Sequence, residues 1–210
     1  MNRTVIIGID GVPFEYLDKF AADLPNVAAL REAGVEAPLE STFPPWTPSA
    51  WPSIYTGKHP AEHGVHGFFA YDENDPTKRR VVSRNDVRAP AIWNYADDAG
   101  ISSIVLNVPV THPAESIDGM ILPGYLAPAS AISHPEDIGE HLSDKGIRWQ
   151  IYADEETGSD SDKKLESYIE LIKSRAKTTE VLLSDFDWRF AFIQVQKTDA
   201  VFHNFAEEIG

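Results

Sequence analysis

Residues 4–11 form the stretch TVIIGIDG, and the interpretation of the fold starts from it. Its β-branched residues predict a buried strand over Thr4–Ile9, and the pair Asp10-Gly11 then predicts a turn. Asp10 thus follows the carboxyl end of a strand, where open α/β sheets place the residues of their active sites. An Asp-Gly pair is also an ordinary turn, so Asp10 alone does not identify a site.

Strand-like and helix-like segments alternate along most of the chain. The pattern of apolar residues predicts helices over residues 14–22, 26–33, 90–99, 135–143 and 161–184, and strands over residues 35–39, 102–107 and 190–195. Residues 71–88 are expected to be an exposed excursion, and residues 111–131 to be mostly loop. This alternation predicts an α/β protein with three layers, α/β/α, and a mostly parallel central sheet. No repeat or linker divides the sequence, so residues 1–210 are expected to form a single domain.

The charge balance and the lack of cysteine narrow the possible functions. The 18 basic and 33 acidic residues give a formal net charge of −15 at pH 7. A field of this sign repels phosphate backbones and anionic bilayers, which disfavours nucleic-acid wrapping and a polybasic membrane anchor. Without cysteine there is no disulfide, no thiolate metal site and no cysteine nucleophile. Any metal ion must therefore be bound by oxygen and imidazole ligands.

Hydropathy gives no sign of a membrane-spanning or exported protein. No window approaches the roughly eighteen consecutive apolar residues that a spanning helix requires. The short apolar run Val5-Ile6-Ile7 meets Gly8 at once and does not resemble a signal peptide. We therefore expect a soluble, cytoplasmic protein, and the sequence leaves its oligomeric state open.

Residues 41–57, STFPPWTPSAWPSIYTG, combine turn formers with aromatic residues. Thr47 followed by Pro48 is typical of a helix start, and Thr56-Gly57 is typical of a helix end, so a helix is predicted between them. Thr47 is then either a helix cap or a nucleophile at the helix N-terminus. A free hydroxyl is a weak nucleophile at neutral pH, so the second role requires a metal ion or a base beside it.

Asp199 and His203 are four residues apart, just after the predicted strand Phe190–Val195. If a helical turn follows this strand, the two side chains share one face and can bind one cation between them. A carboxylate and an imidazole suit zinc, or another divalent metal, in a protein without thiolates. The alternative is an Asp that caps a helix beside an unrelated surface His.

A second group of histidines, His59, His63 and His66, lies within residues 58–67. We rank metal binding there below a structural interpretation, in which His63-Gly64 closes a turn after the Thr47 helix and the other two histidines are exposed.

Together these residues resemble the type I phosphodiesterase and nucleotide pyrophosphatase group of the alkaline phosphatase superfamily. The resemblance is carried by VIIGIDG at residues 5–11, by Thr47 nine residues before TGKHPAEHG at 56–64, and by TDAVFH at 198–203. Residues 93–113 are also similar to a connecting region of these relatives. The run Thr-Gly-x-x-Pro-x-x-His-Gly is quite specific, whereas Asp-Gly is not. The resemblance implies that the three-layer fold is alkaline-phosphatase-like.

The resemblance further implies an enzyme that hydrolyses small phosphoric esters with two divalent metal ions, zinc or alternatively manganese. Asp10 and Thr47 would bind one ion, and Asp199 and His203 the other. Thr47 would act as the nucleophile and become transiently phosphorylated. A phosphomutase or phosphonate hydrolase of the same superfamily, and a catalytically silent metal-binding fragment, are the alternatives.

The sequence departs from the pattern of these relatives in two ways. Ala50 stands where nucleotide pyrophosphatases usually have an asparagine that contacts phosphate, so the phosphate pocket is expected to differ. The relatives also complete their metal sites with an Asp-His-Gly motif and a further His, and neither follows His203 in this sequence. Each ion then has two protein ligands instead of the three typical of catalytic zinc. We therefore expect these 210 residues to be the amino-terminal part of a longer enzyme.

Several aromatic residues are candidates for shaping the substrate. They are Trp46, Trp51, Phe68 and Phe69, together with the polar excursion at residues 71–88. Ordinary packing is the alternative interpretation of the aromatic residues.

Overall fold

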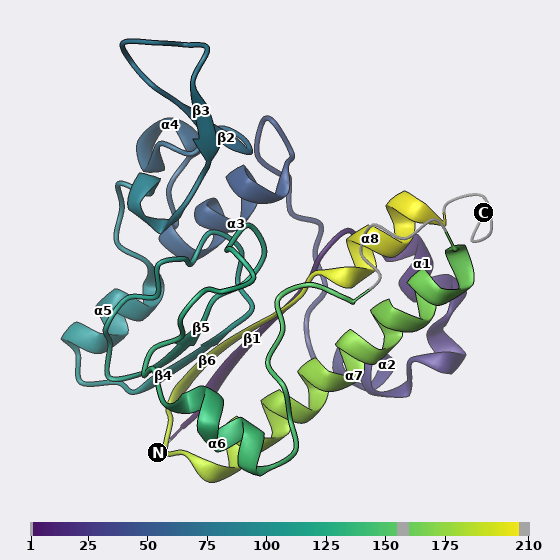
Figure 1. Cartoon of the computed structure of the whole chain (residues 1–210). Helices are drawn as coiled ribbons and strands as arrows, with labels where there is room; N and C mark the ends of the chain where they lie inside the picture. Colours follow the sequence, from purple (N-terminus) through teal and green to yellow (C-terminus); the bar gives the residue numbers. More distant parts are fainter. Residues whose placement is uncertain (1, 155–159, 206–210) are drawn as a thin grey trace.

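Four parallel strands form the central sheet of the computed structural model, which describes residues 2–154 and 160–205. The strands are β1 (Thr4–Ile9), β4 (Ser103–Leu106), β5 (Gly119–Leu122) and β6 (Phe190–Val195). Their order across the sheet is β1-β6-β4-β5 (Figure 1). The predicted strands at 4–9 and 190–195 are therefore direct neighbours, with Ile9 opposite Val195. Because they are parallel, their carboxyl ends meet at one edge of the sheet.

Helices cover both faces of this sheet (Figure 1). They are α3 (Thr47–Thr56), α5 (Ile92–Asp98), α6 (Ile138–Asp144) and α7 (Ser161–Asp185). Trp51 of α3 and Trp93 of α5 pack with Phe192 in the core on one face. Leu182 of α7 packs with Ile193 in the core on the other face. Since successive residues of β6 serve the two cores, the predicted three-layer α/β arrangement with a mostly parallel sheet is confirmed.

The segment after β1 differs from its prediction in two places. α1 (Phe14–Lys19) ends early, and a 3-10 turn, η1 (Ala21–Asp23), leads into α2 (Pro25–Ala33). Residues 35–39 are not a strand, and Val35 and Leu39 are 99% and 90% exposed. A short apolar run forms a strand only against a neighbour, and none of the described strands pairs with it.

The expected excursion at residues 71–88 folds into a small hairpin of its own. After α4 (Pro60–His63), the antiparallel strands β2 (Phe69–Tyr71) and β3 (Arg79–Val81) are followed by a 3-10 turn, η2 (Arg84–Asp86). The hairpin strands are largely exposed, but Arg84 is buried and its Nε donates to Glu115 Oε2 at 2.7 Å. This ion pair anchors the end of the excursion to the rest of the molecule.

β5 lies inside residues 111–131, which were expected to be mostly loop. Its residues Met120, Ile121 and Leu122 are buried and pair with β4. The pairing requires glycine at position 119, because a Cβ there would lie 2.0 Å from the Ser103 carbonyl oxygen. The rest of residues 111–131 is loop, as predicted, but β5 itself was missed because the apolar run is very short and is flanked by Gly and Pro.

β1 lies at an edge of the sheet and is buried on one side only. Ile6 packs against the core that contains Trp51. Val5, Ile7 and Ile9 point to the other side and are 42%, 60% and 45% exposed. The predicted strand therefore forms, but the expectation that it is buried is met on one side of the sheet only.

Among the described residues, no helix combines the length and the apolar character needed to span a bilayer.

Candidate active site at the carboxyl edge of the sheet

Asp10 connects β1 to the helix that follows β6. Its backbone N–H donates to the Val195 carbonyl at 2.9 Å, which extends the pairing of the two strands. Its carbonyl oxygen accepts a hydrogen bond from the Thr198 hydroxyl at 2.6 Å. Thr198 belongs to the first turn of α8 (Lys197–Asn204). The start of α8 is thus held against Asp10 at the carboxyl edge of the sheet.

Thr47 faces Asp10 from the first turn of α3. The N-cap residue of this helix is Trp46, so Thr47 is the first helical residue and not its cap. The Thr47 hydroxyl donates to Asp10 Oδ2 at 3.4 Å, across 37 positions of sequence. Of the two roles considered for Thr47, the cap therefore does not apply, and its hydroxyl lies beside a carboxylate.

The first turn of α3 offers few free donors to an anion. Pro48 has no N–H, and the amides of Ser49 and Ala50 donate to the Trp46 carbonyl at 3.0 and 2.8 Å. The Ala50 side chain adds no polar group. The helix dipole is therefore the main attraction that α3 offers to a negative group beside Thr47.

Asp199 and His203 lie on one face of α8, as their spacing predicted for a helix. His203 Nε2 is 3.5 Å from Asp199 Oδ1. The Asp199 side chain is 26% exposed and that of His203 is 77% exposed. Asp199 lies directly against Gly11, where a Cβ would be 2.8 Å from the Asp199 Cα, and the φ of Gly11 is +70°. Glycine in the turn after Asp10 therefore permits α8 to approach.

The surroundings of the Asp10 carboxyl disfavour its charged form. Burial, and secondly the charge of Asp199, raise its pKa from the ordinary value of 3.8 to about 6. Hydrogen bonds from the side chains of Trp51 and Thr47 lower this pKa, but they do not cancel the increase. Two carboxylates share this edge of the sheet, and a cation bound between them would relieve their repulsion.

The side chains at this edge carry the types of donor atom that bind a divalent cation. Carboxylate oxygen, hydroxyl oxygen and imidazole nitrogen are ligands of zinc and manganese. The geometry brings Asp10 together with Thr47, and Asp199 together with His203. Within residues 2–154 and 160–205, however, no group of three or more His, Cys, Asp and Glu side chains could hold a metal ion. The described residues therefore supply a partial ligand set.

Gln194 and Asn107, which were not predicted as site residues, form a chain of hydrogen bonds that ends at the Asp10 carboxylate. Gln194 of β6 is fully buried, and its Nε2 lies 3.5 Å from Asp10 Oδ2. Asn107, just after β4, donates from Nδ2 to both the carbonyl and the side-chain oxygen of Gln194, each at 3.0 Å. The signal that could have identified them in the sequence is a polar residue within or just after an apolar strand. The contact between Asn107 and Gln194, however, depends on β4 and β6 being neighbours in the sheet.

The run at residues 56–64 connects α3 to α4, and a hydrogen bond between His63 and Ser53 joins the two helices. His59 caps α4, and His63 is fully buried. His63 Nδ1 accepts from the Val65 amide at 3.2 Å, so the ring proton is on Nε2 and donates to the Ser53 hydroxyl of α3 at 2.9 Å. His59 and His66 are exposed. These contacts support the structural interpretation of the three histidines.

Comparisons with known proteins agree with this architecture. A family model described as type I phosphodiesterase / nucleotide pyrophosphatase matches residues 4–209. Two structures of phosphonoacetate hydrolase from Sinorhizobium meliloti 1021, in complex with phosphonoacetate and with phosphonoformate, are similar in fold, each with a TM-score of 0.62 and 20% identity. The alignments cover 93% of this chain and 46% of the hydrolase chain, so this chain spans about half the length of those structures. No curated protein matches significantly.

Proposed function

Because the chain belongs to the type I phosphodiesterase / nucleotide pyrophosphatase family, we propose that it hydrolyses phosphoric esters with Thr47 as nucleophile and two divalent metal ions. In this proposal, residues 1–210 belong to one alkaline-phosphatase-like domain, and the substrate is a small phosphate ester. The observation that carries the proposal is the approach of the Thr47 hydroxyl to Asp10 Oδ2, 3.4 Å, at the carboxyl edge of a parallel sheet.

The proposed reaction has two steps. The Thr47 oxygen attacks phosphorus, the bond from phosphorus to the leaving oxygen breaks, and the hydroxyl proton ends on the departing alcohol. Water then attacks the same phosphorus, the bond from phosphorus to the Thr47 oxygen breaks, a proton from the water restores the hydroxyl, and the product leaves as a phosphate monoester when the substrate is a diester. Asp10 orients the Thr47 hydroxyl by accepting its hydrogen bond, and the dipole of α3 favours negative charge beside it.

Asp10 and Thr47 would hold one metal ion, and Asp199 and His203 the other, with zinc or manganese as the metal. When bound, two such ions neutralise the phosphoryl oxygens and lower the pKa of the attacking hydroxyl. The donor types and the mutual repulsion of Asp10 and Asp199 support this assignment. Gln194 and Thr198 then act as positioning residues, since they hold the Asp10 carboxylate and its backbone.

Hydrolysis of bis(para-nitrophenyl) phosphate, measured after chelation and then with added zinc or manganese, tests this proposal. Thr47→Ala is expected to lower the rate by about a thousandfold or more. Thr56→Ala, at the other end of α3, is the matched control and is expected to leave the rate unchanged. An undiminished rate in Thr47→Ala would show that the nucleophile is another group.

Zinc binding measured by calorimetry tests the second ion site separately. The double variant Asp199→Ala with His203→Ala is expected to lose one bound ion. Asp185 and His141 form another Asp–His pair, with 3.0 Å between Oδ2 and Nε2, on α7 and α6. The double variant Asp185→Ala with His141→Ala is the matched control and is expected to leave both ions bound. If the first double variant binds as much zinc as wild type, the assignment of Asp199 and His203 is wrong.

The alternatives predict different outcomes in the same assays. A phosphonate hydrolase hydrolyses phosphonoacetate, to acetate and phosphate, faster than it hydrolyses the diester. A phosphomutase transfers the phosphoryl group without releasing phosphate. A silent metal-binding fragment binds zinc and leaves every substrate intact. The fold likeness to phosphonoacetate hydrolase, at 20% identity, does not favour one of these reactions over another.

A further inference from the structure

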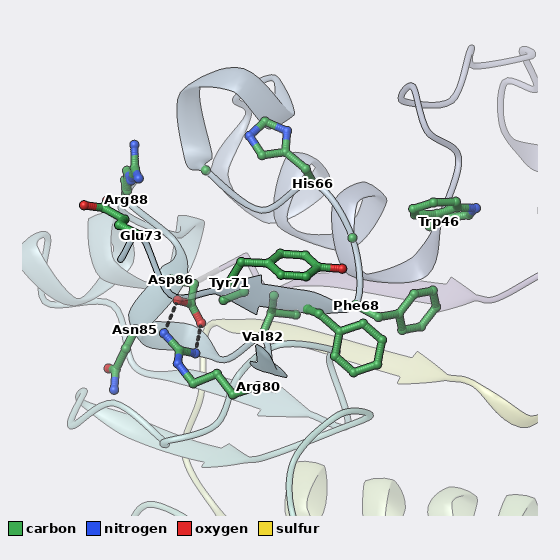
Figure 2. Close-up of a pocket in the computed structure, with 14 residues that line it drawn as sticks. Trp46, His66, Phe68, Tyr71, Glu73, Arg80, Val82, Asn85, Asp86 and Arg88 are labelled. Atoms are coloured by element: carbon green, nitrogen blue, oxygen red, sulfur yellow. Dashed lines mark hydrogen bonds and ion pairs between the residues drawn. The ribbon is translucent and has the colours of Figure 1, made fainter. Parts of the chain in front are cut away.

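A cavity of about 760 Å³ lies between the loop after α4, the β2–β3 hairpin and the turn that follows it, and Trp46, the residue before α3, also lines it. Figure 2 shows Trp46 at one end of it and Arg88 at the other, with the Tyr71 ring between them. Trp46 directly precedes Thr47 in the sequence, so the backbone links this end of the cavity to the first residue of α3, although Thr47 itself does not line the cavity. The volume is within the range that accommodates a small organic ligand.

Aromatic rings form much of the wall and are not used in packing the core. The rings of Trp46 and Phe68 are tilted against each other, with centroids 6.2 Å apart. Trp46 is 51% exposed, Phe69 40% and Tyr71 59%. Trp51, by contrast, is buried in the core. Of the aromatic residues considered for shaping the substrate, Trp46, Phe68 and Phe69 therefore line the cavity, and Trp51 does not.

The far end of the cavity carries a positive charge that no carboxylate of the described residues neutralises. Arg80 is paired with Asp86 through two hydrogen bonds of 2.7 and 2.6 Å (Figure 2). Glu73 also lines the cavity, but no ion pair joins it to Arg88, and Arg88 pairs with no other described residue. In a chain with a net charge of −15, such an arginine is a specific attraction for an anion.

Two glycines of the loop after α4 permit the close approach of Arg88 and Trp46, which lie at the two ends of the cavity. A Cβ at Gly64 would lie 3.1 Å from Arg88 Nε, and a Cβ at Gly67 would lie 3.1 Å from Trp46 Cζ3. The Arg88 backbone N–H also donates to the His63 carbonyl at 2.9 Å. The positions of Arg88 and Trp46 are therefore set by the loop that follows α4, which His63 ties to the helix of Thr47.

We propose that this cavity binds the organic group of the ester, and that this group is aromatic and carries an anionic substituent at the end remote from phosphorus. The aromatic ring lies against Trp46 and Tyr71, and the anion pairs with the Arg88 guanidinium. This inference rests on the proposed function, because it takes the reacting phosphorus to lie beside Thr47.

Binding of naphthoate and of its neutral isostere naphthamide to the full chain, measured by calorimetry, tests the cavity without catalysis. Wild type is expected to bind naphthoate about tenfold more tightly than naphthamide. Arg88→Gln is expected to abolish this difference, and Arg88→Lys to retain part of it. Trp46→Ala is expected to weaken both ligands equally. Arg148→Gln, an exposed arginine outside the cavity, is the control of equal charge change.

Equal affinities of wild type for the two ligands, or an unchanged difference in Arg88→Gln, would overturn the inference. The methyl phosphodiesters of hydroxynaphthoate and of its carboxamide extend the test to turnover, with a preference of about tenfold in kcat/KM expected for the carboxylate. The two proposals fail separately. Undiminished hydrolysis in Thr47→Ala, with binding still dependent on Arg88, refutes the nucleophile alone, whereas binding independent of Arg88 refutes the cavity alone.

Discussion

The Asp10 carboxyl combines burial, a neighbouring carboxylate and a hydrogen bond from a hydroxyl. Burial and the charge of Asp199 both favour its protonated form. A carboxyl whose pKa is higher in the folded state than in the unfolded state binds its proton more tightly when the protein is folded. Its contribution to stability is therefore lost as the pH rises from about 4 through about 6.

Replacing Asp10 by Asn is expected to stabilise the metal-free protein at neutral pH by about 2 kcal/mol, because the buried charge is removed. The free energy of unfolding, measured in urea with a chelator present, should exceed that of wild type above about pH 6, and the two should converge as the pH falls. Asp98→Asn, at an exposed position of α5, is the control. A variant that is less stable than wild type at neutral pH would contradict this electrostatic description.

The sequence allowed part of this site to be predicted. Asp10 could be placed at a strand end, and the spacing of Asp199 and His203 predicted one helical face. Gln194 and Asn107 were not found, because their contacts depend on which strands are neighbours. Residue spacing specifies faces within an element, but it does not specify the order of strands in a sheet.

At the scale of elements, α3 and α4 are joined through the buried side chain of His63. The His63 imidazole is buried and bonded on both nitrogens, to the Val65 amide and to the Ser53 hydroxyl. The two joined helices carry Thr47 at one end and the loop with Gly64 and Gly67 at the other. The specific Thr-Gly-x-x-Pro-x-x-His-Gly run thus acts on the site through the helix that holds the nucleophile.

His63→Ala is expected to lower the free energy of unfolding by about 2–3 kcal/mol, because it opens a cavity and leaves the Val65 amide without its partner. His66→Ala, on the same loop but exposed, should change it by less than about 0.5 kcal/mol. Urea denaturation of both variants measures the difference. Similar stabilities of the two variants would refute the fastening role of His63.

The strand that was predicted at residues 35–39 and does not form, and the strand β5 that was not predicted, share a physical reason. Residues 35–39 and β5 are short apolar runs of similar appearance, yet only β5 lies beside a strand that pairs with it. Whether such a run forms a strand is decided by neighbours distant in sequence and not by local propensity. The longer segments with clear periodicity, β6 and α7, follow their predictions closely.

At the scale of the whole molecule, the sheet is unequally covered. Ile7 of β1 and Ile193 of β6 are register partners, but Ile7 is 60% exposed and Ile193 6%. Both lie on the side of the sheet that α7 covers over the inner strands. The edge formed by β1 carries the Asp10 turn, so the site lies next to the least covered strand of the sheet.

Ile193→Ala is expected to lower the free energy of unfolding by about 2–4 kcal/mol, and Ile7→Ala by less than about 1 kcal/mol. The two substitutions delete the same atoms from paired positions of one sheet, so the comparison isolates the effect of burial. The midpoints of urea unfolding provide the measurement. A loss in Ile7→Ala equal to that in Ile193→Ala would mean that another part of the protein covers β1 in solution.

The whole molecule brings residues from the two ends of the sequence, Asp10 and Asp199, to a single edge with Thr47. Acid quenching during turnover of a phosphodiester, followed by peptide mapping, is the sharpest test that this edge is an active site. The proposed reaction predicts that Thr47 of wild type carries, as its label, the phosphoryl group still esterified to the alcohol retained from the diester, and that the peptide of Thr47→Ala carries no label. Turnover without any label, or with the label on another residue, would contradict it.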